Sequence, residues 1–315
     1  MAELRIALGF GLFVGSMLSG WCLRRWSILT EARASRLVLW LVKIPCLIVL
    51  CLLFWQMDLR HVDPWLLPLL GLLISVSALA PAMLYARCAR LSRAQTGSVL
   101  TCALFSNVGY FGAFTAFALF GEAGYGLCML YLVFFTPSFY TLGFWISRWC
   151  GHSMAVTGSE RAAQDAMRLY PCIGMLLGVL LNLARIPRPA PFEWLNNFLI
   201  PLTTILYLAA IGSQVTFESP RPWLEPCVAM TGIKFLYTPL VAWGLLHLFH
   251  VQGMARMIVL LEAATPVAVS PLVLPMLFGL DRKLSNALWL FTTLAAIPWF
   301  MCFIPLLPYL ERLSK

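Results

Sequence analysis

The sequence predicts an all-α protein that crosses a membrane many times, and three observations carry that prediction. Hydrophobic residues make up 61% of the 315 positions and charged residues only 11%, less than half the usual share in soluble domains. Apolar runs of about twenty residues, each long enough to span a bilayer as a helix, recur from end to end. Lys and Arg gather in the short stretches between these runs. We therefore attribute the net charge of +9 to membrane topology and contact with anionic lipid, and expect no nucleic-acid partner.

Ten membrane-spanning helices are expected, at residues 4–23, 37–57, 64–86, 98–120, 124–147, 169–184, 195–215, 223–249, 256–279 and 285–308. The first run is followed by a basic pair and lacks a small-residue cleavage site, which indicates a retained span and not a signal peptide. With the N-terminus outside, 13 of the 22 Lys and Arg residues lie in the cytoplasm and seven outside, which favours this orientation. Short loops without an N-x-[ST] acceptor fit a bacterial inner membrane.

The ten cysteines form no CxxC or CxH pattern, and most fall inside apolar runs, where a thiol behaves as a small hydrophobe. The sequence therefore predicts neither a disulfide framework nor a metal site, and no organic cofactor.

A hydrophilic stretch divides the chain into two halves of five spans, residues 1–150 and 169–315, joined by a cytoplasmic connector at 151–168. An odd number of spans gives the two halves opposite topologies. Pro45 and Pro201 lie 156 residues apart, and the Leu-Phe-Gly triplets at 119–121 and 277–279 lie 158 apart. These matching residues occur in the same order in both halves and are separated by nearly the same number of residues. We therefore predict two inverted five-helix repeats.

Two expected spans are interrupted at corresponding positions of the halves. The residues that weaken them are Asn107, Gly109 and Gly112 in the fourth span, and Pro266, Pro271 and Pro275 in the ninth. Non-helical backbone at membrane depth persists only where protein buries it or it lines a watery cavity, and a matched pair is typical of a transporter's midplane site. If the two cross, their half-helix N-termini offer N–H groups and positive dipole ends to an anion such as a carboxylate. The alternative is that Gly and Pro in membrane helices only permit close packing, which would be sufficient for a single interrupted segment. The matched pair favours a functional site.

Several motifs resemble the auxin efflux carrier family of permeases, within the larger group that includes bile acid/sodium symporters. They cover most of the chain: RLVLWLVKIPCLIV (36–49), RLSRAQTGSVLTCALFSNVGYFGAFTAFALFGEAGYG (90–126), GIKFLYTPLVAWG (232–244), EAATPVAVSP (262–271) and LFGLDRKLSNALWLFTTLAAIPWF (277–300). The resemblance implies two inverted repeats whose fourth and ninth helices cross at the substrate site. It also implies carriage of small organic anions or weak acids, such as dicarboxylates or indole-type acids. By position, Asn107 and Gly109 would belong to the first crossover, and Thr265 and Pro266 to the second.

The chain departs from the family at Glu262, where many members carry a small residue, and in Ala-Thr-Pro where a double proline is common. Glu262 could couple transport to a proton or sodium ion, since ionisable groups within membranes are functional by default. The bile-acid symporter group places a glutamate there among its sodium ligands, but the following Gln-Asn pair is absent, which argues against sodium. The alternative is an ion pair with Lys43 or Lys234, both within expected spans. Either lysine could also balance a substrate carboxylate, or extend to the interface.

These features favour a secondary carrier of small organic anions or weak acids, working by an elevator or rocking motion around the crossover site. No Walker motif is present, so ATP does not drive transport directly, and HExxH, GxSG and GxGD are all missing, which disfavours an intramembrane enzyme. A sodium-coupled symporter of the bile-acid type and a transporter-derived sensor are the alternatives. Expected partners are the organic anion, the bilayer and, in a homodimer, a second copy of the chain.

Overall fold

The computed structural model describes residues 2–57, 62–152, 158–213 and 221–312. Regular structure in these ranges is helical, apart from one isolated antiparallel bridge between Ser106 and Val267. Six of the described helical stretches are long and apolar enough to cross a membrane, namely Glu31–Gln56, Trp65–Cys88, Val108–Cys150, Ala190–Gly212, Arg221–Leu248 and Arg282–Leu307. This supports a polytopic membrane protein. The count of ten spans stays a prediction.

The chain forms two compact units, and each draws on both halves of the sequence. Unit 1 comprises Met1–Arg60, Ala113–Met129 and Val156–Thr216, and unit 2 comprises the remainder. A compact unit and a sequence repeat are different properties, so the division into residues 1–150, 151–168 and 169–315 is not tested. Within the predicted connector, residues 153–157 lie outside the described residues and helix α10 begins at Gly158.

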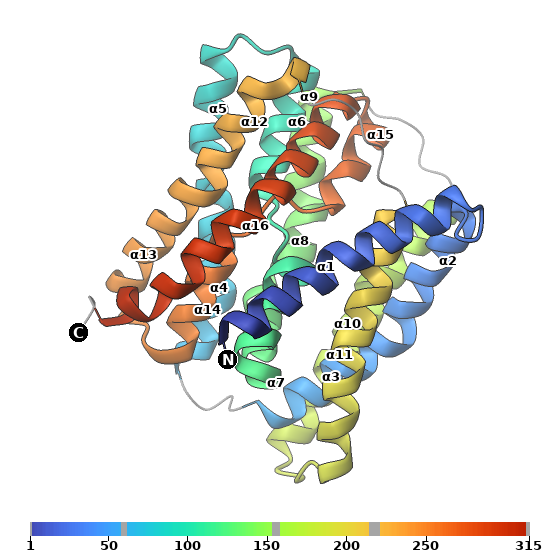
Figure 1. Cartoon of the computed structure of the whole chain (residues 1–315), viewed down its shortest axis with the longest axis vertical. Helices are drawn as coiled ribbons and strands as arrows, with labels where there is room; N and C mark the ends of the chain where they lie inside the picture. The colour runs from blue at the N-terminus through green and yellow to red at the C-terminus, as the bar shows by residue number, and fades with distance from the viewer. Residues whose placement is uncertain (1, 58–61, 153–157, 214–220, 313–315) are drawn as a thin grey trace. The chain divides into compact units, whose positions relative to one another are not determined.

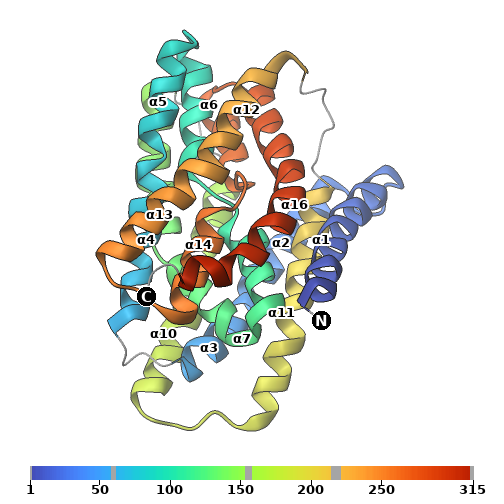
Figure 2. The same cartoon turned by 60° about the vertical axis from the view of Figure 1, so that its left-hand side comes forward.

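Unit 1 is built from long helices that pack through small residues. Its helices are α1 (Ala2–Arg25), α2 (Glu31–Leu41), the π-helical turn η1 (Val42–Cys46), α3 (Leu47–Gln56), most of α7 (Ala113–Tyr131), α10 (Gly158–Leu183) and α11 (Ala190–Gly212). Helix α3 packs on α10, as both cartoons show (Figures 1 and 2). At Gly174 of α10 a Cβ would lie only 3.0 Å from Leu47 Cα, so glycine there permits the close approach that membrane helices use.

Unit 2 contains most of the broken helices. Its elements are α4 (Val62–Ser77), α5 (Leu79–Cys88), α6 (Arg93–Leu104), η2 (Val108–Gly112), α8 (Phe135–Ser138), η3 (Phe139–Gly143), α9 (Phe144–Cys150), η4 (Arg221–Trp223), α12 (Leu224–Gly232), η5 (Ile233–Tyr237), α13 (Thr238–Leu248), α14 (Gly253–Ala263), η6 (Ser270–Val273), α15 (Leu274–Phe278) and α16 (Arg282–Arg312). Large side chains that are almost fully buried, including Phe105, Phe111, Trp289 and Phe300, fill its core.

Among the interruptions of the helical path in the described part of unit 2, three fall in the fourth, fifth and ninth expected spans. Helix α6 ends at Leu104 and helical structure resumes at Val108, while α14 ends at Ala263 and resumes at Ser270. Both breaks fall inside the stretches that the sequence predicts as interrupted. Proline, which lacks an N–H, accounts for the second break at Pro266. The third break, at residues 132–134 before α8, lies inside the expected fifth span and contains neither Gly nor Pro.

Candidate functional site

The two predicted breaks pair with each other through their backbones. The Asn107 N–H donates to the Pro266 carbonyl at 2.7 Å, and the Ala268 N–H donates to the Phe105 carbonyl at 3.0 Å. Between these bonds Ser106 lies opposite Val267. The Val267 N–H donates to the hydroxyl of Thr292 on α16 at 3.2 Å. The non-helical segments thus satisfy each other's polar groups, as buried backbone requires.

The carbonyl ends of the helices that lead into the breaks are closed by side chains of a third helix. Lys234, with 0% of its surface exposed, donates from its ammonium to the Ala103 carbonyl of α6 at 2.6 Å. Thr238, one helical turn later, donates to the Ala263 carbonyl of α14 at 2.7 Å. The last carbonyls of a helix have no partner within the helix and carry the negative end of its dipole. The stretch η5–α13 therefore supplies hydrogen-bond donors where both broken helices need them.

The amino end of η2 carries the positive end of a helix dipole, in contrast to the carbonyl ends of α6 and α14. Asn107 precedes it, and its backbone carbonyl accepts the N–H groups of Phe111 at 3.2 Å and Gly112 at 3.1 Å. Its side-chain oxygen lies 3.4 Å from the same Phe111 nitrogen. The N–H groups of the first turn, at Val108 and Gly109, have no acceptor earlier in the helix and mark its positive dipole end. An anion is favoured at such a position.

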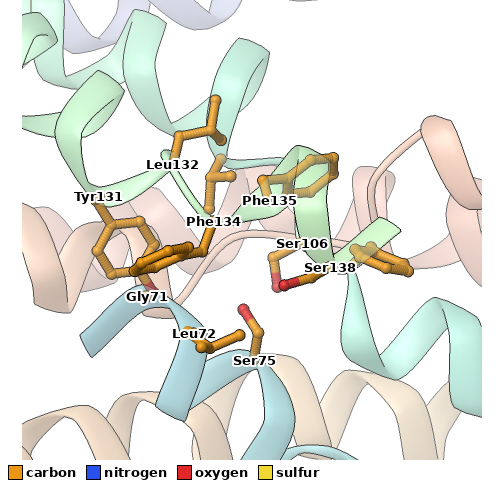
Figure 3. Close-up of a pocket in the computed structure, with 11 residues that line it drawn as sticks. Gly71, Leu72, Ser75, Ser106, Tyr131, Leu132, Phe134, Phe135 and Ser138 are labelled. Carbon is orange, nitrogen blue, oxygen red and sulfur yellow. The ribbon is translucent and has the colours of Figure 1, made fainter. Parts of the chain in front are cut away.

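A pocket lies beside the first break, and three serine hydroxyls meet in it (Figure 3). Figure 3 shows Ser75 from α4, Ser106 from the break and Ser138 from α8 with their oxygens directed toward one another. The remaining lining residues are Gly71, Leu72, Phe105, Val108, Tyr131, Leu132, Phe134 and Phe135. The lining thus combines three hydroxyls with aromatic side chains, the mixture of polar and apolar groups that ligand pockets use.

The polar end of this pocket is connected to a buried charge. The hydroxyl of Ser106 accepts a hydrogen bond from the Lys234 ammonium at 2.8 Å. In low dielectric a unit charge acts strongly over such distances, so Lys234 makes the serine end of the pocket favourable for an anion.

Glu262 is also fully buried, near the end of α14. Its carboxylate packs against Gly112, where an added Cβ would lie 2.6 Å from the carboxyl carbon. Thr265, itself buried, donates from its hydroxyl to the Glu262 backbone carbonyl at 2.7 Å. The structure therefore brings Glu262, Gly112 and Thr265 together. Their roles in coupling and binding stay predictions.

The other expected site residues divide between the units. Gly109 lies next to Leu132, whose side chain would be 3.5 Å from a Cβ at that position. Asn107 and Pro266 are joined by their backbone bond. Lys43 belongs to unit 1, where its exposed side chain places the ammonium 5.9 Å from the centre of the Tyr170 ring. An ion pair of Glu262 with either lysine is not tested.

Sequence reasoning missed Ser106, Thr238 and the two further pocket serines. Ser106 directly precedes Asn107, and Thr238 follows Lys234 by one turn, so their positions beside predicted residues were the only available signal. Ser75 lies in the expected third span, and Ser138 directly follows Pro137 in the expected fifth span, a proline that could have marked a break there. Among the residues that the structure describes, no three His, Cys, Asp or Glu side chains gather as a metal site.

Unit 1 holds a second buried polar cluster. The two terminal nitrogens of the Arg188 guanidinium donate to Glu122, one of them to Oε2 at 2.9 Å, and Asn196 donates to the same carboxylate at 2.7 Å. The side chain of Arg188 is 3% exposed, although its position in the sequence indicates an outer loop. Glu122 follows Gly121, whose φ of 65° bends α7 in a conformation that glycine adopts readily. The cluster therefore lies directly after a bend of α7.

Comparison with known proteins finds relatives that are named as transporters. The chain is 27% identical over 290 residues to a protein of Methanothermobacter thermautotrophicus named an uncharacterized transporter, covering 89% of this chain and 92% of that protein. A second protein with that description, from Methanocaldococcus jannaschii, is 23% identical over 215 residues, covering 66% and 68%. The chain is similar to transporters. No family model matches it, and the resemblance to auxin efflux carriers stays a prediction.

Proposed function

We propose that this protein is a secondary carrier of small organic anions, and that the paired breaks with the serine pocket form its substrate site. The similarity to named transporters and the long apolar helices support a membrane transporter in general and point away from an enzyme. The nature of the substrate is argued from the site alone.

The observation that carries the proposal is the buried Lys234 ammonium bonded to Ser106 at the pocket wall. A charge at membrane depth is costly, and its presence beside a pocket is what a carrier of anions needs. The helix N-terminus at Val108, which also lines the pocket, adds a second source of positive potential. A carboxylate could accept hydrogen bonds from the serine hydroxyls while the aromatic side chains bury its apolar part.

Alternating access requires bodies that move with respect to each other, and the division of the chain into two compact units suits that requirement. Glu262 is the candidate for proton coupling, because its carboxylate lies against the turn that begins the second half of the broken helix. On this proposal Glu262→Gln abolishes the pH dependence of transport. A Glu262→Gln variant that keeps the wild-type rate at every pH would remove the coupling role and leave the anion site untouched.

A thermal-shift screen of the purified protein against organic acids, with and without sodium, tests the proposal. A carboxylate should raise the Tm of the wild-type protein. Asn107→Ala, which loses the side chain that precedes η2, should reduce that response, whereas Asn197→Ala on the exposed face of α11 should retain it. A panel in which no acid stabilises the protein would contradict the anion site. Binding without flux in liposomes would instead favour a sensor.

A further inference from the structure

The ammonium of Lys234 is a buried cation, and two oxygens at the first break accept its hydrogen bonds. It lies in the π-helical turn η5, is fully buried, and donates to the Ala103 carbonyl at 2.6 Å and the Ser106 hydroxyl at 2.8 Å. Both acceptors are neutral oxygens. Carbonyl and hydroxyl oxygens are also the ligands that hard cations take in proteins, and π-helical turns occur often at functional sites.

This ammonium completes two structures that the break would otherwise leave open. It closes the carbonyl end of α6, where the helix dipole favours positive charge. It also holds the hydroxyl of Ser106, which is part of the pocket wall and of the bridge to Val267. Because the Lys234 ammonium already supplies the positive charge at this break, an ion from solution is not needed to hold these groups together.

We propose that the Lys234 ammonium is a resident cation of the paired breaks, which assembles this part of the site and completes the anion site without sodium. The first half of this inference concerns the assembly of the site and stands on its own. The second half rests on the proposed function.

Chemical rescue tests the first half. Lys234→Ala removes three methylene groups and the ammonium, which together have the shape of n-propylammonium. We expect the Tm of this variant to lie below that of the wild type, and n-propylammonium chloride to restore part of the loss by binding the vacated space. 1-Propanol has the shape without the charge, and choline has the charge without N–H donors, so neither should restore it.

The wild type and Lys43→Ala serve as controls, since Lys43 is an exposed lysine in a π-helical turn of unit 1. Neither should respond to n-propylammonium. An equal Tm increase in the wild type, or an equal effect of choline on Lys234→Ala, would overturn the resident-cation role. So would a Tm of Lys234→Ala equal to that of the wild type.

Lys234→Gln provides a second variant should Lys234→Ala fail to fold. It keeps N–H donors for the two oxygens but carries no charge. A Tm lower than that of the wild type, together with a reduced response to carboxylates, is expected. A wild-type Tm in Lys234→Gln would show that the charge is not needed and would overturn the inference.

Sodium dependence tests the second half. The Tm increase that a carboxylate produces in the wild type should be the same in sodium chloride and in choline chloride, and a requirement for sodium would contradict it. The rescue experiment needs no transported substrate. Rescue of Lys234→Ala without any carboxylate response would therefore refute the proposed function and leave the resident cation standing.

Discussion

Lys234 and Thr238 lie one helical turn apart and donate hydrogen bonds to the carbonyl ends of two different broken helices. The lysine reaches Ala103 at the end of α6, and the threonine reaches Ala263 at the end of α14. One short helical stretch thereby fixes both sides of the paired breaks, whose own backbones meet at Asn107 and Pro266.

Thr238→Val should lower the free energy of unfolding by about 1–2 kcal/mol, because the Ala263 carbonyl loses a buried hydrogen-bond donor. Thermal unfolding of the detergent-purified protein measures this. Thr231→Val is the matched control, because the Thr231 hydroxyl lies at hydrogen-bonding distance from the Cys227 carbonyl of its own helix. Thr238 has a corresponding contact with the Lys234 carbonyl, so the two variants differ in the contact with α14. Equal losses in the two variants would show that the contact with α14 contributes nothing.

Gly112→Ala should destabilise the protein, because the new Cβ would lie 2.6 Å from the Glu262 carboxyl carbon. Shortening the opposing side chain in Gly112→Ala/Glu262→Ala should recover part of the loss, a coupling that a double-mutant cycle measures. Gly232→Ala has nothing within 4 Å of its Cβ and should be neutral or slightly stabilising. Additive effects of the Gly112 and Glu262 substitutions would count against direct contact.

Ser75→Ala and Ser138→Ala should each weaken carboxylate binding roughly 2- to 10-fold, the loss of one hydrogen bond of about 0.5–1.5 kcal/mol. Titration of the Tm shift with the best acid from the screen gives the affinities. Ser77→Ala lies on the same helix as Ser75, but its hydroxyl bonds the Ile74 carbonyl, so it should bind as the wild type does. Equal affinity in all three variants would exclude the serine pocket as the binding site.

Glu122→Gln or Arg188→Met should destabilise unit 1 by about 3–5 kcal/mol, because each leaves a buried charge without its partner. Arg24→Met removes one side of a pair with Glu31 whose side chains are 44% and 75% exposed, and solvent screening should keep that loss within about 1 kcal/mol. Comparable losses at the two pairs, measured by thermal unfolding, would mean that burial does not set their strength.

The sequence allowed the two main breaks to be located, because proline removes a backbone donor and leaves a local signature in any apolar run. Asn107 and Glu262 stand out in the same way, as polar groups in segments that are otherwise apolar. The break at residues 132–134 itself contains only Leu, Val and Phe, but Pro137 follows it and cannot donate a helical hydrogen bond to the Val133 carbonyl. The same proline signature was therefore present in the expected fifth span.

The contacts of Ser106, Thr238 and Arg188 could not be predicted for a related reason. A hydroxyl or guanidinium finds its acceptor through tertiary placement, 131 residues away for Lys234 and Ala103 and 66 for Arg188 and Glu122. The spacing of neighbouring residues in the sequence does not indicate which distant residues will form such pairs. The expected roles of Gly109, Thr265 and Lys43 are likewise matters for experiment.

The central claim is that the pocket beside the paired breaks carries organic anions, and uptake into proteoliposomes tests it most directly. The radiolabelled acid that stabilises the protein best should enter liposomes with the wild type and with Ser77→Ala at similar rates. Ser106→Ala, which removes both a pocket hydroxyl and the acceptor of Lys234, should slow uptake about tenfold or more. Equal uptake by Ser106→Ala and Ser77→Ala, or no uptake of any acid by the wild type, would contradict the claim.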